Sequence, residues 1–182
     1  MAIHREEKKP NYKAYLHKIK AFAFDVDGVF TDGSVLALPD GDLLRAHNAK
    51  DGFAVKMAVK NKYPIAIITG GDSESVRIRF SKLGVTDIYM KSRNNVPDFL
   101  KFCEKHHLQP EEVAFVGDDL PDRPVLEICG LAVCPSDAVD EVKEVCDFIS
   151  PFGGGRGCVR NLIEQVMKVH ETWHFDPIVY SE

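Results

Sequence analysis

Short apolar runs recur along the chain and are separated by longer stretches of mixed polarity. Within each run the apolar residues are continuous rather than alternating, which is typical of strands that are covered on both faces in a parallel sheet. The runs that we interpret as strands are residues 21–24, 65–68, 85–90, 113–116 and 131–133.

The stretches between these runs carry helix start and stop signals. Asp72 or Ser73 can cap the helix after the second run, and Gly84 can end it. The alternation predicts an α/β fold: a three-layer, doubly wound, mostly parallel, Rossmann-like sheet with right-handed crossovers. The expected helices are residues 51–62, 73–83, 96–107, 124–128, 137–145 and 157–170.

One segment interrupts this alternation. Residues 34–38 and 43–46 flank the turn-forming residues 39–42, which predicts a β-hairpin. The ends of the chain look like additions to the core. We therefore divide the sequence into an N-terminal extension (1–17), one domain (18–170) and a C-terminal tail (171–182).

Composition narrows the possible classes of protein. The chain has 182 residues, of which 45% are hydrophobic, enough for one domain with a substantial core. A net charge of -5 argues against a nucleic-acid partner, and no apolar run is long enough to span a membrane. The five scattered cysteines favour buried thiols, and no signal-peptide core is visible, so we expect a cytoplasmic protein.

Polar residues follow three of the predicted strands directly. Asp25 and Asp27 follow the first run, Thr69 and Gly70 the second, and residues 117–119 (Gly-Asp-Asp) the fourth. Open parallel sheets hold ligands at the carboxyl ends of their strands, so these groups are expected to meet. Carboxylates brought together suit Mg²⁺, although Asp-x-Asp taken alone is about as consistent with a simple turn.

These segments resemble motifs of the haloacid dehalogenase-like phosphatase superfamily. The matching segments are residues 25–32 (DVDGVFTD), 68–70 (ITG) and 117–122 (GDDLPD), and the resemblance spans about residues 18 to 168. It implies hydrolysis of a phosphate monoester through a phosphorylated aspartate. A carboxylate nucleophile divides such a reaction into two steps, and a neighbouring carboxyl group can serve both as acid and base.

The resemblance also implies a role for each site residue. Asp25 would be the nucleophile and a Mg²⁺ ligand, and Asp27 the acid–base, binding Mg²⁺ through its main-chain oxygen. Asp118 would be the other protein ligand of the metal. The expected supporting residues are Thr69 and Gly70 for phosphate, and Asp119 and Asp122 in a shell around the metal ligands.

Nothing in the sequence is left over for a cap domain. The chain therefore resembles the capless, tetrameric branch that hydrolyses 3-deoxy-D-manno-octulosonate 8-phosphate in lipopolysaccharide precursor synthesis. The alternative substrate is a nonulosonate 9-phosphate, of KDN or N-acetylneuraminate. This branch implies a homotetramer built through the hairpin at residues 34–46. It also makes Lys50 and Arg156 candidates for binding a phosphorylated keto-sugar acid. Arg156 belongs to a glycine-rich loop, residues 153–157, which could otherwise be a plain flexible segment.

Two positions depart from the pattern. Asn95 stands where the superfamily has a lysine that neutralises phosphate, and we expect Lys91, or else Arg93, to supply the charge. Gly71 matches neither the arginine of the octulosonate branch nor the glutamate of the nonulosonate branch.

Two functions of other classes therefore stay open. A weakly or non-catalytic sugar-phosphate-binding protein is suggested by Asn95 and opposed by the intact aspartates. A receiver-type phospho-acceptor domain is opposed by Thr69, because receivers carry an aspartate at the end of a middle strand.

Overall fold

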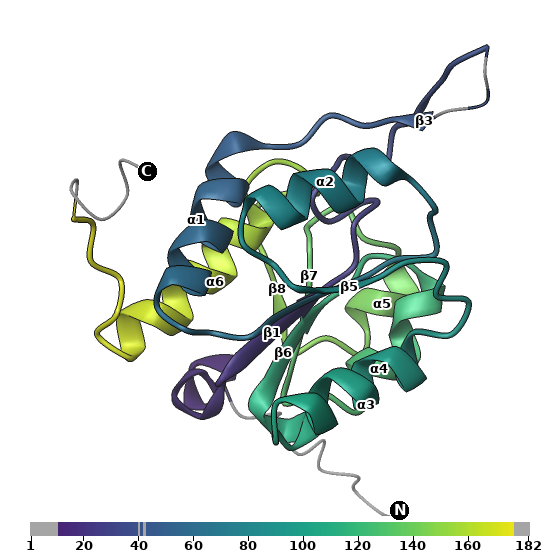
Figure 1. The fold of residues 1–182 in the computed structure, drawn as a ribbon. Helices are drawn as coiled ribbons and strands as arrows, with labels where there is room; N and C mark the ends of the chain where they lie inside the picture. Colours follow the sequence, from purple (N-terminus) through teal and green to yellow (C-terminus); the bar gives the residue numbers. More distant parts are fainter. Residues whose placement is uncertain (1–10, 40, 42, 177–182) are drawn as a thin grey trace, which may run out of the picture.

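A central parallel sheet carries the whole domain (Figure 1). The computed structural model describes residues 11–39, 41 and 43–176. Six strands pair in the order β5-β4-β1-β6-β7-β8, and every pairing is parallel, as the doubly wound prediction requires. The strands are β1 (Ala21–Phe24), β4 (Ile65–Ile68), β5 (Asp87–Tyr89), β6 (Val113–Val116), β7 (Leu131–Cys134) and β8 (Phe148–Ile149).

The continuous apolar runs are explained by a core on each face of the sheet. In β1, Phe22 and Phe24 face one core, and Ala21 and Ala23 face the other. Helices α1, α2 and α6 cover the first face, and α3, α4 and α5 cover the second (Figure 1). The helices are α1 (Ala49–Lys60), α2 (Glu74–Lys82), α3 (Asn95–Lys105), α4 (Arg123–Leu126), α5 (Asp140–Lys143) and α6 (Cys158–Val169). The 3₁₀ turns are η1 (Tyr12–Ala14), η2 (Leu16–Lys18), η3 (Pro110–Glu112) and η4 (Leu120–Asp122).

The ends of some helices differ from the prediction, and local hydrogen bonds involving side chains are found at these ends. Helix α1 begins two residues early, because the side chain of Asn48 accepts a hydrogen bond from the Lys50 amide at 2.8 Å and caps it. Helix α5 is shorter than predicted. Asp137, where the predicted helix began, lies before α5 and accepts a hydrogen bond from the Gly154 amide at 2.9 Å. Ser73 occupies the N-cap of α2, but its hydroxyl bonds the hydroxyl of Ser75 rather than the helix backbone.

The hairpin is present but its arms are short. Strands β2 (Leu36–Ala37) and β3 (Leu43–Leu44) pair antiparallel, and the hairpin projects away from the body of the domain (Figure 1). Two of its turn residues, 40 and 42, lie outside the described residues. Four of its large apolar side chains are exposed: Val35, Leu36, Leu43 and Leu44.

Both described ends of the chain pack on the core. The ring of Tyr12 stacks on Phe148 with centroids 4.2 Å apart, and Leu16 is buried. Near the other end, Arg160 lies over the ring of Trp173 at 5.5 Å. The division into extension, domain and tail stays a prediction. No helix within residues 11–176 has the length and hydropathy needed to cross a membrane.

Candidate active site

A polar hollow of about 570 Å³ lies at the carboxyl edge of the sheet. Strands β1, β4 and β6 each deliver residues to it, so the three polar strand ends of the sequence do meet. Its lining residues are Asp25, Asp27, Gly33, Thr69, Gly70, Gly71, Ser92, Arg93, Asn95, Asp118, Asp119, Pro121 and Asp122.

Three carboxyl groups converge in this hollow. Oxygen atoms of Asp25, Asp118 and Asp122 all lie within 4.8 Å of one another. The close approach depends on Gly28, whose φ is +85° and where a Cβ would stand 1.9 Å from Asp118 Oδ2. A side chain at position 28 would therefore push Asp118 out of the cluster.

The cluster is costly to ionise in the absence of a cation. Burial, followed by the charge of Asp122, raises the pKa of Asp25 well above its ordinary value. Burial, with the charges of Asp122 and Asp119, raises the pKa of Asp118 to about 7. Burial also raises the pKa of Asp122 to about 6, although hydrogen bonds from the backbone amides of Asp118 and Asp119 act in the opposite direction.

Asp122 is occupied in supporting its neighbours. Its Oδ2 accepts a hydrogen bond from the Asp118 amide at 3.0 Å, and its Oδ1 accepts one from the Asn95 side chain at 2.8 Å. Both Asp122 and Asn95 are buried. Asn95 therefore holds Asp122 by a neutral hydrogen bond and brings no positive charge into the hollow.

The donor set fits a hard divalent cation. All three clustered groups offer carboxylate oxygens, the ligands that Mg²⁺ prefers, and a cation between them would remove the repulsion that raises their pKa values. With Asp122 held by three nitrogen donors, Asp25 and Asp118 are the carboxylates free to take a metal directly.

Asp27 lies in the same hollow but faces a cation of the protein itself. Arg45 donates from Nε to Asp27 Oδ1 at 2.6 Å and from Nη2 to Oδ2 at 2.9 Å. Sequence reasoning missed Arg45. The sequence did offer a signal for it: the predicted hairpin directly follows the first aspartate motif, and Arg45 lies at the end of its second arm.

The second polar segment forms one wall. Thr69 is buried, and its hydroxyl accepts a hydrogen bond from the Gly71 amide at 3.2 Å. The Ser92 amide donates to the Thr69 carbonyl at 3.0 Å, which ties the loop after β5 to this wall. Thr69 and Gly70 therefore line the same hollow as the aspartates, and their contact with a phosphate stays a prediction.

The two candidate cations after β5 take different positions. Lys91 has a left-handed backbone (φ 56°), its side chain is 68% exposed, and its Nζ pairs with Asp72 at 2.7 Å. The lining of the hollow includes Arg93 and does not include Lys91. The loop after β5 therefore places Arg93, and not Lys91, among the residues that line the hollow.

Lys50 and Arg156 line a neighbouring groove of about 630 Å³, together with Arg160 and Lys168. Arg156 Nη2 lies 3.5 Å from Asp32 Oδ2, at the end of the first motif. The glycine-rich loop packs on that motif so closely that a Cβ at Gly154 would stand 2.0 Å from the Gly28 carbonyl oxygen. The groove is thus adjacent to the aspartates but separate from them.

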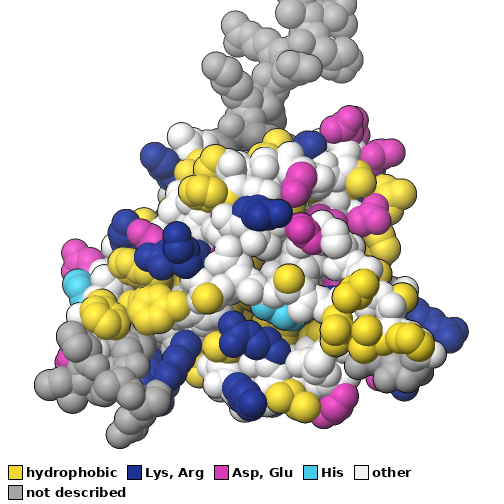
Figure 2. Space-filling model, turned by 90° about the horizontal axis from the view of Figure 1, so that it is seen from above, with side chains coloured by type: hydrophobic (Ala, Val, Ile, Leu, Met, Phe, Trp, Pro, Cys, Tyr) yellow, Lys and Arg dark blue, Asp and Glu magenta, His cyan; other side chains and the backbone are white. Residues whose placement is uncertain are grey.

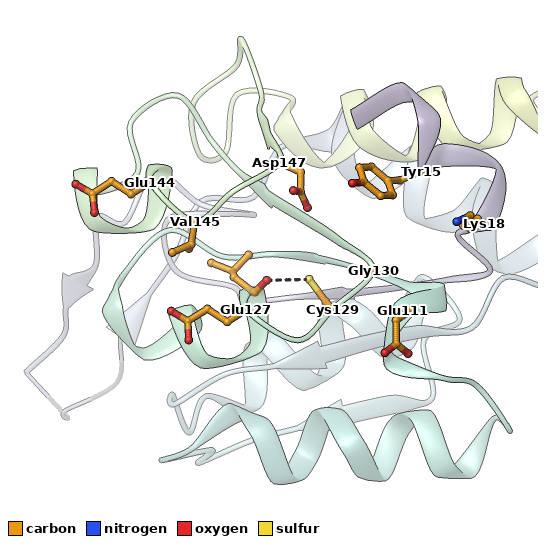
Figure 3. Close-up of a pocket in the computed structure, with 10 residues that line it drawn as sticks. Tyr15, Lys18, Glu111, Glu127, Cys129, Gly130, Glu144, Val145 and Asp147 are labelled. Carbon is orange, nitrogen blue, oxygen red and sulfur yellow. Dashed lines mark hydrogen bonds between the residues drawn. The ribbon is translucent and has the colours of Figure 1, made fainter. Parts of the chain in front are cut away.

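Another hollow, of about 570 Å³, lies at the opposite end of the sheet (Figure 3). It is lined by residues that precede strands, such as Lys18 before β1, Gly130 before β7 and Asp147 before β8. Several of its side chains are acidic, and Cys129 donates a hydrogen bond to the Leu126 carbonyl at 3.5 Å. None of the predicted site residues contributes to it.

The chain resembles known phosphatases over most of its length. Residues 46–153 match the haloacid dehalogenase-like hydrolase family. The 3-deoxy-D-manno-octulosonate 8-phosphate phosphatase KdsC of Escherichia coli strain K12 is 36% identical over 154 residues, which is 85% of this chain and 82% of that protein. The KdsC protein of Yersinia pestis is 32% identical over 149 residues, 82% of this chain and 80% of its own length.

Solved structures show the same architecture. The crystal structure of the Yersinia pestis phosphatase superposes with a TM-score of 0.87 at 29% identity, covering 90% of this chain and 88% of that one. The enzyme of Moraxella catarrhalis, crystallised with a magnesium ion, a phosphate ion and KDO, gives a TM-score of 0.85 at 27% identity. It covers 93% of this chain and 97% of its own.

The raised pKa of Asp118 predicts a pH-dependent gain in stability when its charge is removed. An aspartate whose pKa is raised on folding costs stability as the pH rises from its unfolded value of 3.8 through about 7. In chelator, Asp118→Asn should therefore raise the melting temperature more at pH 8 than at pH 5. Each kcal/mol of relieved repulsion should add about 2–4 °C. Thermal unfolding followed by circular dichroism measures this.

The matched control is Asp140→Asn, which removes the same charge from a side chain that is 94% exposed. It should change the melting temperature little at either pH. A stabilisation by Asp118→Asn that is equal at pH 5 and pH 8 would contradict the raised pKa.

Proposed function

Because the chain belongs to the haloacid dehalogenase-like hydrolase family, we propose that it is a Mg²⁺-dependent phosphatase of 3-deoxy-D-manno-octulosonate 8-phosphate. The observation that carries the reaction type is the convergence of Asp25, Asp118 and Asp122 at the carboxyl edge, with Asp27 and Thr69 in the same hollow. The relatives' activity, and the enzyme structure that holds magnesium, phosphate and KDO, support the substrate and the metal. The nonulosonate 9-phosphates stay alternative substrates, since Gly71 matches neither branch.

The proposed reaction uses two aspartates in two steps. Asp25 attacks phosphorus and becomes phosphorylated, while Asp27 gives a proton to the departing alcohol oxygen. In the second step Asp27 takes a proton from a water molecule that attacks the same phosphorus, and the carboxylate of Asp25 is released.

The remaining residues bind and orient the reacting groups. Asp25, Asp118 and the main-chain oxygen of Asp27 would hold Mg²⁺, and Asp122 fixes the loop that carries Asp118. When bound, the metal offsets the negative charge of the phosphoryl group and the carboxylates. Thr69 and Gly70 contact the phosphate, and Asp119 supports the metal site from outside.

Arg93 takes the place proposed first for Lys91, because it lines the hollow. A cation at this point favours the charge that develops on the phosphoryl oxygens. Lys50 and Arg156 would bind the carboxylate of the sugar acid from the groove that they line, in which Glu164 already pairs with Arg160 and Lys168.

We further propose a cytoplasmic homotetramer assembled through the hairpin. The four exposed apolar side chains of the hairpin support this assembly, since a surface hairpin rarely presents so much apolar area to water. Figure 2 shows hydrophobic side chains gathered in groups on one face of the molecule.

Asp25→Asn is expected to abolish phosphate release from 3-deoxy-D-manno-octulosonate 8-phosphate, because an amide cannot form the phosphorylated intermediate. Wild-type protein should release phosphate with Mg²⁺ and lose the activity in excess chelator. Circular dichroism should show both proteins folded. Wild-type turnover in Asp25→Asn, or full activity in chelator, would contradict the mechanism. No release by the wild-type protein from any sugar phosphate would favour the binding protein that Asn95 suggested.

Arg93→Met should lower kcat by about 100-fold or more, the usual effect of removing one charge-stabilising donor. The matched variant is Lys91→Met, which removes a positive charge two residues away whose Nζ pairs with Asp72. Steady-state kinetics should show little change for it. A larger loss in Lys91→Met than in Arg93→Met would return the role to Lys91.

Leu36→Asp should dissociate the tetramer, because it places a charge at an apolar contact. Leu36 is 63% exposed in the single chain, and Leu100 on α3, at 44%, provides a matched control. Light scattering after size-exclusion chromatography should give a tetramer for the wild type and for Leu100→Asp. A monomeric wild type at micromolar concentration would overturn the proposed assembly.

A further inference from the structure

The side chain that holds Asp27 comes from the hairpin and lies outside all the sequence motifs. Arg45 follows β3, and its side chain is 6% exposed, whereas that of Asp27 is 36% exposed. Its two hydrogen bonds to Asp27, of 2.6 and 2.9 Å, come from adjacent nitrogens of one planar guanidinium group. A pair of hydrogen bonds from one guanidinium group fixes the plane of a carboxylate as well as its position.

Arg45 is itself held from two directions. Its Nη1 donates to the Leu43 carbonyl at 2.9 Å, which ties the guanidinium to the hairpin arm. On the other side it lies against Gly71, where a Cβ would stand 3.6 Å from Nη2 and 3.5 Å from Thr69 Oγ1. These are ordinary contact distances for one methyl group. A longer side chain at position 71 would enter the volume that the guanidinium occupies.

We propose that Arg45 is a positioning residue for proton transfer: it aims the carboxyl group of Asp27 at the departing oxygen, and it ties that orientation to the hairpin arm that ends at Leu44. The proposal rests on the proposed phosphatase function.

Each oxygen of Asp27 accepts one hydrogen bond from Arg45, so the oxygen that carries the proton gives up its bond to Arg45 while the other oxygen keeps its own. In the first step Asp25 bonds to phosphorus as the bond from phosphorus to the alcohol oxygen breaks, and the alcohol oxygen keeps the electron pair. It takes the proton from one oxygen of Asp27, while Arg45 retains the second oxygen. In the second step the attacking water gives its proton back to Asp27, its oxygen bonds to phosphorus, and the bond between phosphorus and Asp25 breaks.

The test uses leaving groups that differ in their need for a proton. A sugar alcohol needs protonation as it departs, whereas p-nitrophenolate departs readily without it. Arg45→Met should therefore lower kcat for 3-deoxy-D-manno-octulosonate 8-phosphate by about 10–100-fold, the effect of a small misplacement of a reacting group. It should change KM little, and it should hardly change the first-turnover release of p-nitrophenolate from p-nitrophenyl phosphate, which precedes the water attack that also uses Asp27.

Arg77→Met is the matched control. Arg77 is an exposed arginine of α2 whose Nε lies 3.5 Å from Glu74, and its replacement should leave kcat for both substrates unchanged. Gly71→Gln is a second probe that keeps Arg45 but crowds its guanidinium. It should likewise lower kcat for the sugar phosphate without slowing the release of p-nitrophenolate. It replaces Arg45→Met in the test if that variant does not fold.

A double-mutant cycle with Asp27→Asn separates action through Asp27 from a general effect on the fold. If Arg45 acts through Asp27, Arg45→Met should cause almost no further loss in the Asp27→Asn background. Equal losses on both substrates, or fully additive losses in the cycle, would overturn the proposal for Arg45 while leaving the phosphatase function standing. A wild-type protein that hydrolyses neither substrate with Mg²⁺ would overturn both.

Discussion

The mutual repulsion of three carboxyl groups at one edge of the sheet is the constraint on which the rest of the site depends. Asp25 and Asp118 are fixed there by adjacent parallel strands, since Phe24 pairs with Val116 and each aspartate follows shortly after. Burial and close approach raise their pKa values, so the protein holds a group of acids that is stable only with protons or a cation among them. The buried pair of Asp122 and Asn95 keeps that arrangement in place, because it fixes the loop after β6 by neutral and backbone hydrogen bonds.

Positive charge reaches the site from loops rather than from the sheet. Arg45 arrives on the hairpin and Arg93 on the loop after β5, while Asn95 supplies only a hydrogen bond where the superfamily has a lysine. The site therefore combines aspartates that are held at the ends of strands with arginines that lie on the hairpin and on the loop after β5. Under the proposed function, the acidic residues would determine the metal and the reaction type, whereas the loops would align the acid–base group and the phosphate.

The parallel sheet covered on both faces and the meeting of the aspartates were predictable from the sequence, because continuous apolar runs and strand-end polar residues follow from burial and connectivity. The two-residue strand β8 was not, since Phe148–Ile149 is too short for any periodicity. The start of α1 was missed by two residues because the Asn48 cap decides it. The partner of Asp27 was not predictable either, because a contact across 18 residues depends on where the hairpin folds back. Which of Lys91 and Arg93 lines the hollow was not predictable either, because it depends on the left-handed turn at Lys91.

Under the proposed function, the carboxylate cluster is a site for one divalent cation, which replaces the protons that the cluster otherwise retains. Calorimetric titration of the metal-free protein with Mg²⁺ near pH 7, repeated in buffers of different ionisation enthalpy, measures both the stoichiometry and the protons released. We expect one Mg²⁺ to bind per chain and the carboxylate cluster to release protons as it binds, because the pKa of Asp118 is about 7 before the metal binds. Binding without proton release, or no binding at millimolar Mg²⁺, would contradict it.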